Sequence, residues 1–160
     1  MKDKIMITKV GNYQLNQSIN EVPDLREYTD EEYQMFEIAG YKRILEDEKI
    51  FRGRKVKFAG VTWDETTIGV TNNEIYKISL QFITQNKNLA KTVFKTTLNY
   101  LVEQMGKYNE HLFLSKKYIW DAPEGNFICE KLSKFEQYCI NIFITSNSIR
   151  KQMQDYVSKH

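Results

Sequence analysis

Two tryptophan–aspartate pairs are the residues of this chain whose types and spacing best suit ligand binding. Trp63-Asp64 and Trp120-Asp121 each stand where an apolar, strand-like run ends. An indole ring offers a flat apolar surface, and the neighbouring carboxylate offers a fixed charge. We therefore take both pairs as candidate binding residues. The alternative interpretation is that the rings are core or rim residues and that each aspartate opens a turn.

A basic stretch between residues 49 and 57 is the second candidate. It contains five lysines and arginines interleaved with aromatic residues, and Arg52 and Arg54 are its candidate binding residues. Such side chains neutralise phosphates, and an exposed ring stacks on bases. Val56 and Phe58 are expected to point inward, however, which leaves the lysines beside them on the solvated side of an edge strand. We favour this second interpretation and keep a nucleic-acid-binding module at residues 49–57 as an alternative.

The sequence has none of the local motifs that mark common catalytic and cofactor sites. It contains no Gly-x-Ser-x-Gly, Cys-x-x-Cys or His-Glu-x-x-His pattern and no phosphate-binding glycine loop. His111 and His160 are the only histidines, too few to complete a zinc site with the two cysteines. We assign no catalytic residue, no metal and no cofactor. A small enzyme or ligand-binding domain with a pocket between sheet and helix is kept as an alternative, because catalytic geometry need not leave a local motif.

Cys129 and Cys139 are predicted to face each other across a hairpin that turns about Lys134. In that register the numbers of paired residues sum to 268, as these two do. A disulfide between directly opposed residues is geometrically awkward, and no signal peptide indicates an oxidising compartment. We predict reduced thiols, with a disulfide and half of a metal site as the alternatives.

The elements that would position these residues are clearest where the hydrophobic period changes. Residues 76–82 alternate between apolar and polar, which predicts a strand with Tyr76 and Ile78 on one face. Residues 88–105 instead show the apolar stripe of an amphipathic helix, and Gly106 follows its end. A strand that leads into such a helix implies a sheet with a helix across one face.

Caps and turns supply most of the remaining elements. Thr29-Asp30-Glu31-Glu32 has the form of a capping box and predicts a helix that ends near Gly40. Asn72-Asn73 predicts a two-residue hairpin turn. Further strands are predicted at about 5–10, 55–58, 61–63, 66–71, 112–120, 126–132 and 137–145, and a closing helix at 149–157. The sequence therefore predicts an α+β fold in which antiparallel sheets of about six strands pack against a long central helix, in the order α-βββ-α-βββ-α.

The length of 160 residues predicts one domain spanning 1–160. Within it we distinguish an acidic, helical N-terminal segment, 1–48, from a sheet-plus-helix core, 49–160. The formal charge is −7 from Glu21 to Glu48 and +7 from Lys49 onward. These opposite fields either cancel in the folded chain or leave a patch that steers a partner.

Three lysines recur every four residues on the predicted long helix, at Lys87, Lys91 and Lys95. Such a ladder is typical of a solvated outer face. The alternative is that it meets the acidic N-terminal helix, within one molecule or across a dimer.

The functional expectation is a small soluble binding protein without catalytic activity that acts through protein–protein interaction. The segregated charge and the 19 tyrosines and phenylalanines favour this class, since aromatic residues are common in binding hot spots. No apolar run is long enough to cross a bilayer, so we expect no membrane association and a cytoplasmic location. We expect a protein partner and no nucleic acid, and a homodimer is left open.

The order of helix, antiparallel strands, helix, strands and helix resembles that of small bacterial secretion chaperones, which are dimeric and bind unfolded effector segments. Those chaperones tend to be acidic, whereas this chain has a net charge of +2. In size and type the chain also resembles the single-domain immunity proteins that neutralise bacterial toxins. Both resemblances imply a bacterial protein of inhibitor or chaperone type.

Overall fold

The computed structural model describes residues 5–40, 47–112, 114 and 116–147. The predicted closing helix at 149–157 lies outside these residues.

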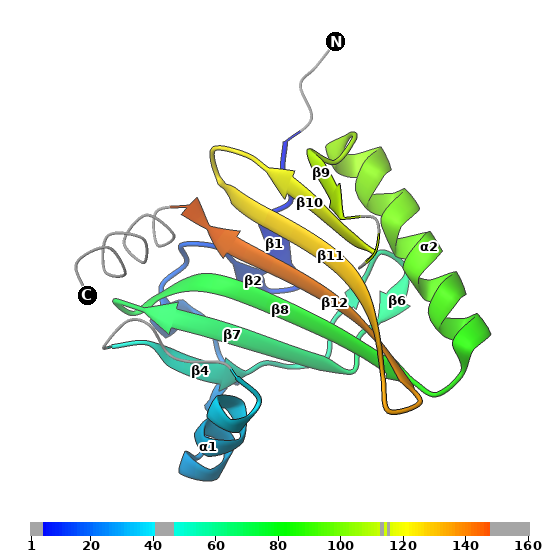
Figure 1. Ribbon diagram of the computed structural model, residues 1–160. Helices are drawn as coiled ribbons and strands as arrows, with labels where there is room; N and C mark the ends of the chain where they lie inside the picture. The colour runs from blue at the N-terminus through cyan, green and yellow to red at the C-terminus, as the bar shows by residue number, and fades with distance from the viewer. Residues whose placement is uncertain (1–4, 41–46, 113, 115, 148–160) are drawn as a thin grey trace.

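The fold is α+β and is built on an antiparallel sheet of eight strands (Figure 1). The strands run across the sheet in the order β3 (Arg26–Glu27), β4 (Lys49–Arg52), β7 (Glu65–Thr71), β8 (Glu74–Thr84), β12 (Gln137–Ser146), β11 (Gly125–Lys134), β10 (Lys117–Asp121) and β9 (Glu110–Leu112). The prediction of an antiparallel sheet is confirmed, whereas the prediction of about six strands was too low. The edge strands β3 and β9 have only two and three residues, too few to show an alternating pattern.

Short hairpins complete the β structure. β1 (Lys9–Val10) pairs with β2 (Tyr13–Gln14), and β5 (Lys57–Phe58) pairs with β6 (Val61–Thr62). The 3₁₀-helix η1 (Ile19–Glu21) lies between β2 and β3. Before residue 49 the described residues therefore form three short strands as well as helical turns.

The helix α1 (Asp30–Ile38) begins at the capping box read from the sequence. The hydroxyl of Thr29 accepts a hydrogen bond from the backbone N–H of Glu32 at 3.2 Å, and the Glu32 carboxylate accepts one from the backbone N–H of Thr29 at 3.1 Å. These reciprocal bonds satisfy two donors that would otherwise be unpaired at the start of the helix.

The longer helix, α2 (Lys87–Met105), lies along one face of the sheet (Figure 1). Asn86 caps its start by accepting a hydrogen bond from the backbone N–H of Leu89, and Gly106 follows its end with a φ of 82°. One side of the helix is buried, at Ala90, Val93, Phe94, Thr97, Leu101 and Met105. The predicted helix at 88–105 is confirmed to within one residue.

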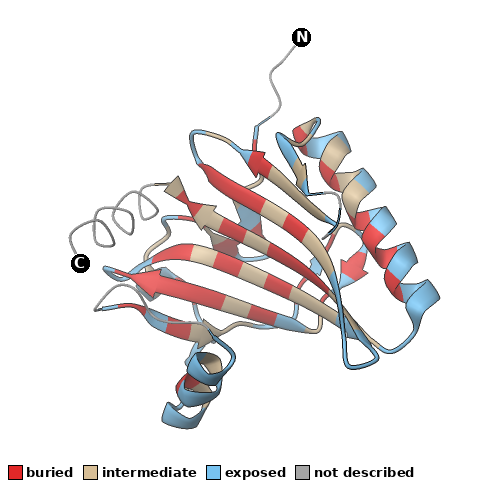
Figure 2. Cartoon of the chain, in the orientation of Figure 1, coloured by how far each residue is buried: buried red, intermediate tan, exposed pale blue. Residues whose placement is uncertain are grey.

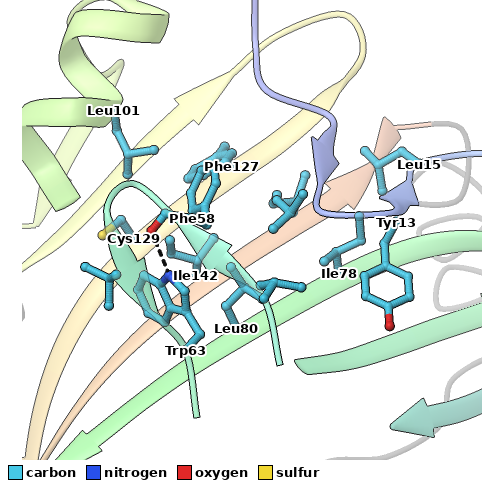
Figure 3. Close-up of a cluster of buried hydrophobic side chains, with 14 of the residues drawn as sticks. Tyr13, Leu15, Phe58, Trp63, Ile78, Leu80, Leu101, Phe127, Cys129 and Ile142 are labelled. Atoms are coloured by element: carbon cyan, nitrogen blue, oxygen red, sulfur yellow. Dashed lines mark hydrogen bonds between the residues drawn. The ribbon is translucent and has the colours of Figure 1, made fainter. Parts of the chain in front are cut away.

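The hydrophobic core fills the space between this face of the sheet and α2 (Figure 3). The two small hairpins contribute to the same cluster through Tyr13, Phe58 and Val61. Along the central strands, fully buried residues alternate with less buried ones (Figure 2). The core thus occupies one face of the sheet, and the other face has a different character.

A β-bulge corrects the expected placement of Tyr76. The register between β7 and β8 shifts at Gly69 and Val70, so Ile75 pairs with Val70 and joins the core. Tyr76 is buried outside that core cluster, with its ring against Gly69, where a Cβ atom would come within 2.8 Å of Tyr76 Cε1. The extra residue of the bulge breaks the alternation on which the expectation was based.

The predicted register of the two cysteines was wrong. Cys129 pairs with Ile142 and Cys139 pairs with Leu132, because the hairpin turns at Phe135 and Glu136, which both have positive φ. The three-residue shift puts the cysteines on opposite faces of the sheet. Both thiols are free. Cys129 is completely buried in the core, and this burial raises the pKa of its thiol.

Candidate functional site

The face of the sheet opposite α2, which we call the polar face, has a row of half-buried residues at its centre. The strand register aligns these residues across six strands: Ile119, Ile128, Phe143, Ser79, Thr67 and Arg52. None of them is fully buried or fully exposed. The β10, β11 and β12 half of this row is apolar, and the β8, β7 and β4 half is polar.

Polar side chains flank the central row on one side and bond to one another across the strands. The side-chain amide of Gln81 donates to Oδ1 of Asn141 at 3.1 Å, and the amide of Asn141 donates to a carboxylate oxygen of Glu130 at 3.2 Å. These bonds hold the three side chains in place before any ligand arrives. A partner would therefore meet an ordered set of donors and acceptors.

The other flank of the central row is also polar. Asn126 donates its amide to Oδ1 of Asp121 at 2.6 Å. Lys77 extends over the ring of Phe143, with its Nζ 5.1 Å from the ring centroid. Burial lowers the pKa of Lys77, while the nearby Glu48 carboxylate acts in the opposite direction. The central row thus lies between two polar rows.

A shallow cavity of about 180 Å³ opens on the polar face between α1 and the sheet. Phe36 and Tyr28 border it on the α1 side, and Lys77, Ser79 and Asn141 are among the residues that border it on the sheet side. Its size suits one amino-acid side chain and is below the roughly 300–1,000 Å³ of sites for drug-sized ligands.

An ion-pair network borders the polar face at its β3–β4 edge. Arg26 and Arg52 each approach a carboxylate oxygen of Glu32 at 2.8 Å, and Arg52 also lies 3.6 Å from Glu65. The guanidinium of Arg52 is 5.5 Å from the ring centroid of Tyr28. Hydrogen bonds hold the pKa of Glu32 well below its usual range, first from Arg26, then from its own helix cap and Arg52.

Both tryptophans proposed from the sequence lie in the core. Trp63 is 0% exposed and donates its indole N–H to the carbonyl of Phe58 at 3.1 Å (Figure 3). Trp120 is 3% exposed and donates to the carbonyl of Gly106 at 2.9 Å. Each ring therefore already has a partner for its polar group, and neither offers a free flat surface.

The remaining proposed residues are spread over the molecule. Asp64 accepts a hydrogen bond from the backbone N–H of Ile83 at 2.8 Å. Asp121 and Arg52 both lie on the polar face, but Asp121 is on β10 and Arg52 is on β4, near opposite edges of the sheet. Arg54 forms an exposed ion pair with Asp24 at 2.8 Å. The structure therefore brings Asp121 and Arg52 onto one surface without bringing them together.

The polar face was missed at the level of sequence, although part of its signal is visible there. On β8 the residues between the buried ones are Lys77, Ser79 and Gln81, all polar. On β12 the corresponding residues are Asn141 and Phe143. The alternation identifies which residues share a face, but only the register shows that they form continuous rows.

Neither a metal site nor a membrane span is found in the part of the chain that the structure describes. Within it, no group of three or more histidines, cysteines, aspartates and glutamates is placed to hold an ion. The described helices are all too short or too polar to cross a membrane. Comparison with known proteins adds no relative, since no family model, curated protein or solved structure matches this chain.

Proposed function

We propose that this chain is a non-catalytic binding protein that recognises a protein partner through its polar face. The observation that carries the proposal is the half-buried apolar stretch formed by Ile119, Ile128 and Phe143, which lies between two polar rows. Protein interfaces commonly have this anatomy, with an apolar centre that loses its water and a polar rim.

The dimensions of the face support a protein partner. Six strands about 4.8 Å apart span roughly 24 Å. A standard interface buries about 800 Å² per partner, equivalent to a square of roughly 28 Å. The cavity of about 180 Å³ on this face is small for a drug-sized ligand but large enough for one side chain of a partner.

The charges near the face support a protein partner over a nucleic acid. Arg52 is engaged by Glu32 and Glu65, and Arg54 by Asp24. These pairs neutralise the charges of both arginines within the molecule, which weakens the attraction of the 49–57 region for phosphates.

The experiment has two stages. Affinity capture from the source cell first supplies a candidate partner, which by itself proves nothing about the face. The dissociation constant of the purified pair is then measured by calorimetry for the wild type, for Ile128→Lys and for Phe135→Lys. Phe135 is 87% exposed at the β11–β12 turn, so its substitution makes the same type of change away from the polar face.

We expect Ile128→Lys to weaken binding at least tenfold, because a charge would be buried at the centre of the interface, while Phe135→Lys stays within twofold. Circular dichroism must show that both variants keep the wild-type fold. Unchanged affinity of the folded Ile128→Lys variant would exclude the polar face as the binding surface.

A further inference from the structure

A second surface lies where the hydrophobic core ends, between the start of α2 and the hairpin that joins β11 and β12 (Figure 1). On β11 the residues that follow Cys129 on the same face are Lys131 and Ser133, and on β12 Tyr138 lies beyond Ile140. Apolar residues thus give way to an amine and hydroxyl groups on the face that α2 covers elsewhere.

Four lysines gather at this end of the molecule. Lys87 and Lys91 lie one turn apart at the start of α2, Lys116 precedes β10, and Lys131 lies on β11. The backbone N–H of Lys131 donates to the carbonyl of Lys116 at 3.3 Å, which ties the two strands together at this point. We call these four residues the lysine cluster.

The positive charges of the lysine cluster are not compensated within the described residues. No ion pair there joins any of the four amines to a carboxylate. Burial lowers the pKa of Lys131, and the charges of Lys116, Lys91 and Lys87 lower it further. Like charges held together repel one another, and a bound anion would remove that cost.

The lysine cluster borders a hollow of about 420 Å³. Lys87, Lys116 and Lys131 line it together with the hydroxyl-bearing Ser133 and Tyr138, and Leu114 and Leu132 complete the lining. Its volume falls within the roughly 300–1,000 Å³ typical of small-molecule sites. The first turn of α2 also directs the positive end of a 19-residue helix toward this region.

We propose that the lysine cluster binds a small anion that carries at least two phosphate groups. One carboxylate would bring a single negative charge to several amines, whereas each terminal phosphate brings about −1.5 to −2 near pH 7. Lysine binds phosphate as a point charge, and the hydroxyls of Ser133 and Tyr138 add donors for phosphate oxygens. This site is separate from the polar face and does not depend on the function proposed there.

Titration calorimetry of the full chain with inorganic pyrophosphate tests the proposal, with orthophosphate and sulfate as comparison anions. Saturable binding of one pyrophosphate is expected, at least tenfold tighter than either comparison anion and weaker as salt is added. Lys116→Gln and Lys131→Gln should each weaken it at least fivefold. Lys95→Gln removes the same charge from the next step of the α2 lysine ladder, outside the hollow, and should change the affinity less than twofold.

Phosphorus NMR of bound pyrophosphate provides a second readout, since its resonance should shift with the wild type and much less with Lys131→Gln. The proposal is overturned if pyrophosphate binds no better than sulfate, or if Lys95→Gln weakens binding as much as Lys131→Gln does. Tighter binding of a glutamate-rich peptide than of pyrophosphate would also overturn it, and would assign the cluster to an acidic protein segment.

Discussion

Charges are arranged in opposite ways at two sides of this molecule. At the β3–β4 edge, Arg26 and Arg52 converge on Glu32, so each charge has an opposite charge within 2.8 Å. In the lysine cluster, three of the four amines line one hollow, and none of the four is paired to a carboxylate among the described residues. The first arrangement contributes to the fold by itself, whereas the second has a cost that a bound anion would relieve.

The contrast shows what a tally of charge along the sequence leaves out. Residues 21–48 and 49–160 carry formal charges of −7 and +7, which suggests simple cancellation. The structure uses Arg52 and Arg54 for that purpose, since both pair with acids of the N-terminal segment. The lysine cluster lies elsewhere, and no acid of the described residues forms an ion pair with it.

The largest effect is expected from the core contact that holds α2, and with it part of the lysine cluster, against the sheet. Leu101 is 0% exposed and fixes α2 against the sheet. Leu101→Ala should cost about 2–5 kcal/mol, because it removes buried methyl groups and leaves a cavity. Urea unfolding followed by circular dichroism measures it. Leu98, which is only half-buried on the same helix, is the matched position, and Leu98→Ala should cost clearly less.

Acid should weaken the arginine–glutamate network. Because the folded-state pKa of Glu32 lies below its ordinary value of 4.5, the carboxylate stabilises the fold above about pH 4.5 and loses that contribution as the pH falls. Glu32→Gln should therefore lower the urea midpoint at pH 7 and differ much less from the wild type at pH 2. A constant difference between the two proteins over that range would contradict the role given to this carboxylate.

The lysine cluster should behave in the opposite sense. Lys131→Gln removes a repelled charge, so in the absence of a bound anion it should raise the melting temperature slightly. The corresponding gain in the free energy of unfolding should be less than about 0.5 kcal/mol. Because the folded-state pKa of Lys131 is lowered from its ordinary value of 10.5, the penalty is fully present below that folded-state pKa, falls as the pH rises above it and is gone above the ordinary value. Melting curves at pH 7 and pH 10, each at low and high salt, measure it. A lower melting temperature for the variant at pH 7 and low salt would show that the cluster is not strained.

The smallest effect is expected for an isolated surface pair. Arg54 and Asp24 have side chains that are 72% and 51% exposed, so solvent screens their attraction. Arg54→Ala should change the urea midpoint by less than Glu32→Gln does at neutral pH. If Arg54→Ala changed the urea midpoint as much as Glu32→Gln or more, the networked ion pairs would contribute no more to stability than the isolated pair.

Local signals in the sequence predicted the local structure well. The capping box at Thr29, the Asn72-Asn73 turn and the stripe of α2 depend on neighbouring residues, and the structure confirms each of them. Both turn asparagines have positive φ, at 52° and 62°. Asparagine tolerates this conformation well.

Long-range features were not accessible from the sequence in the same way. The predicted strand at 112–120 divides into β9 and β10, because the chain turns at Lys116, which has a φ of 47°. The predicted register of the β11–β12 hairpin was wrong by three residues, because Phe135 and Glu136, which form its turn, are not typical turn residues. The polar face depends on the register of six strands, so even correct strand boundaries would not have revealed it.

The placement of the two cysteines on opposite faces provides a natural pair of chemical reporters. Cys139 lies half-buried beyond the polar face's central row, so alkylating reagents should reach it in the native state, although burial raises the pKa of its thiol and slows the reaction. Cys129 has no exposed surface and should react only when the layer between α2 and the sheet opens. The rate at which a thiol reagent modifies Cys129, the second cysteine to react, would therefore measure how often the core opens. This measurement needs no substitution in the chain.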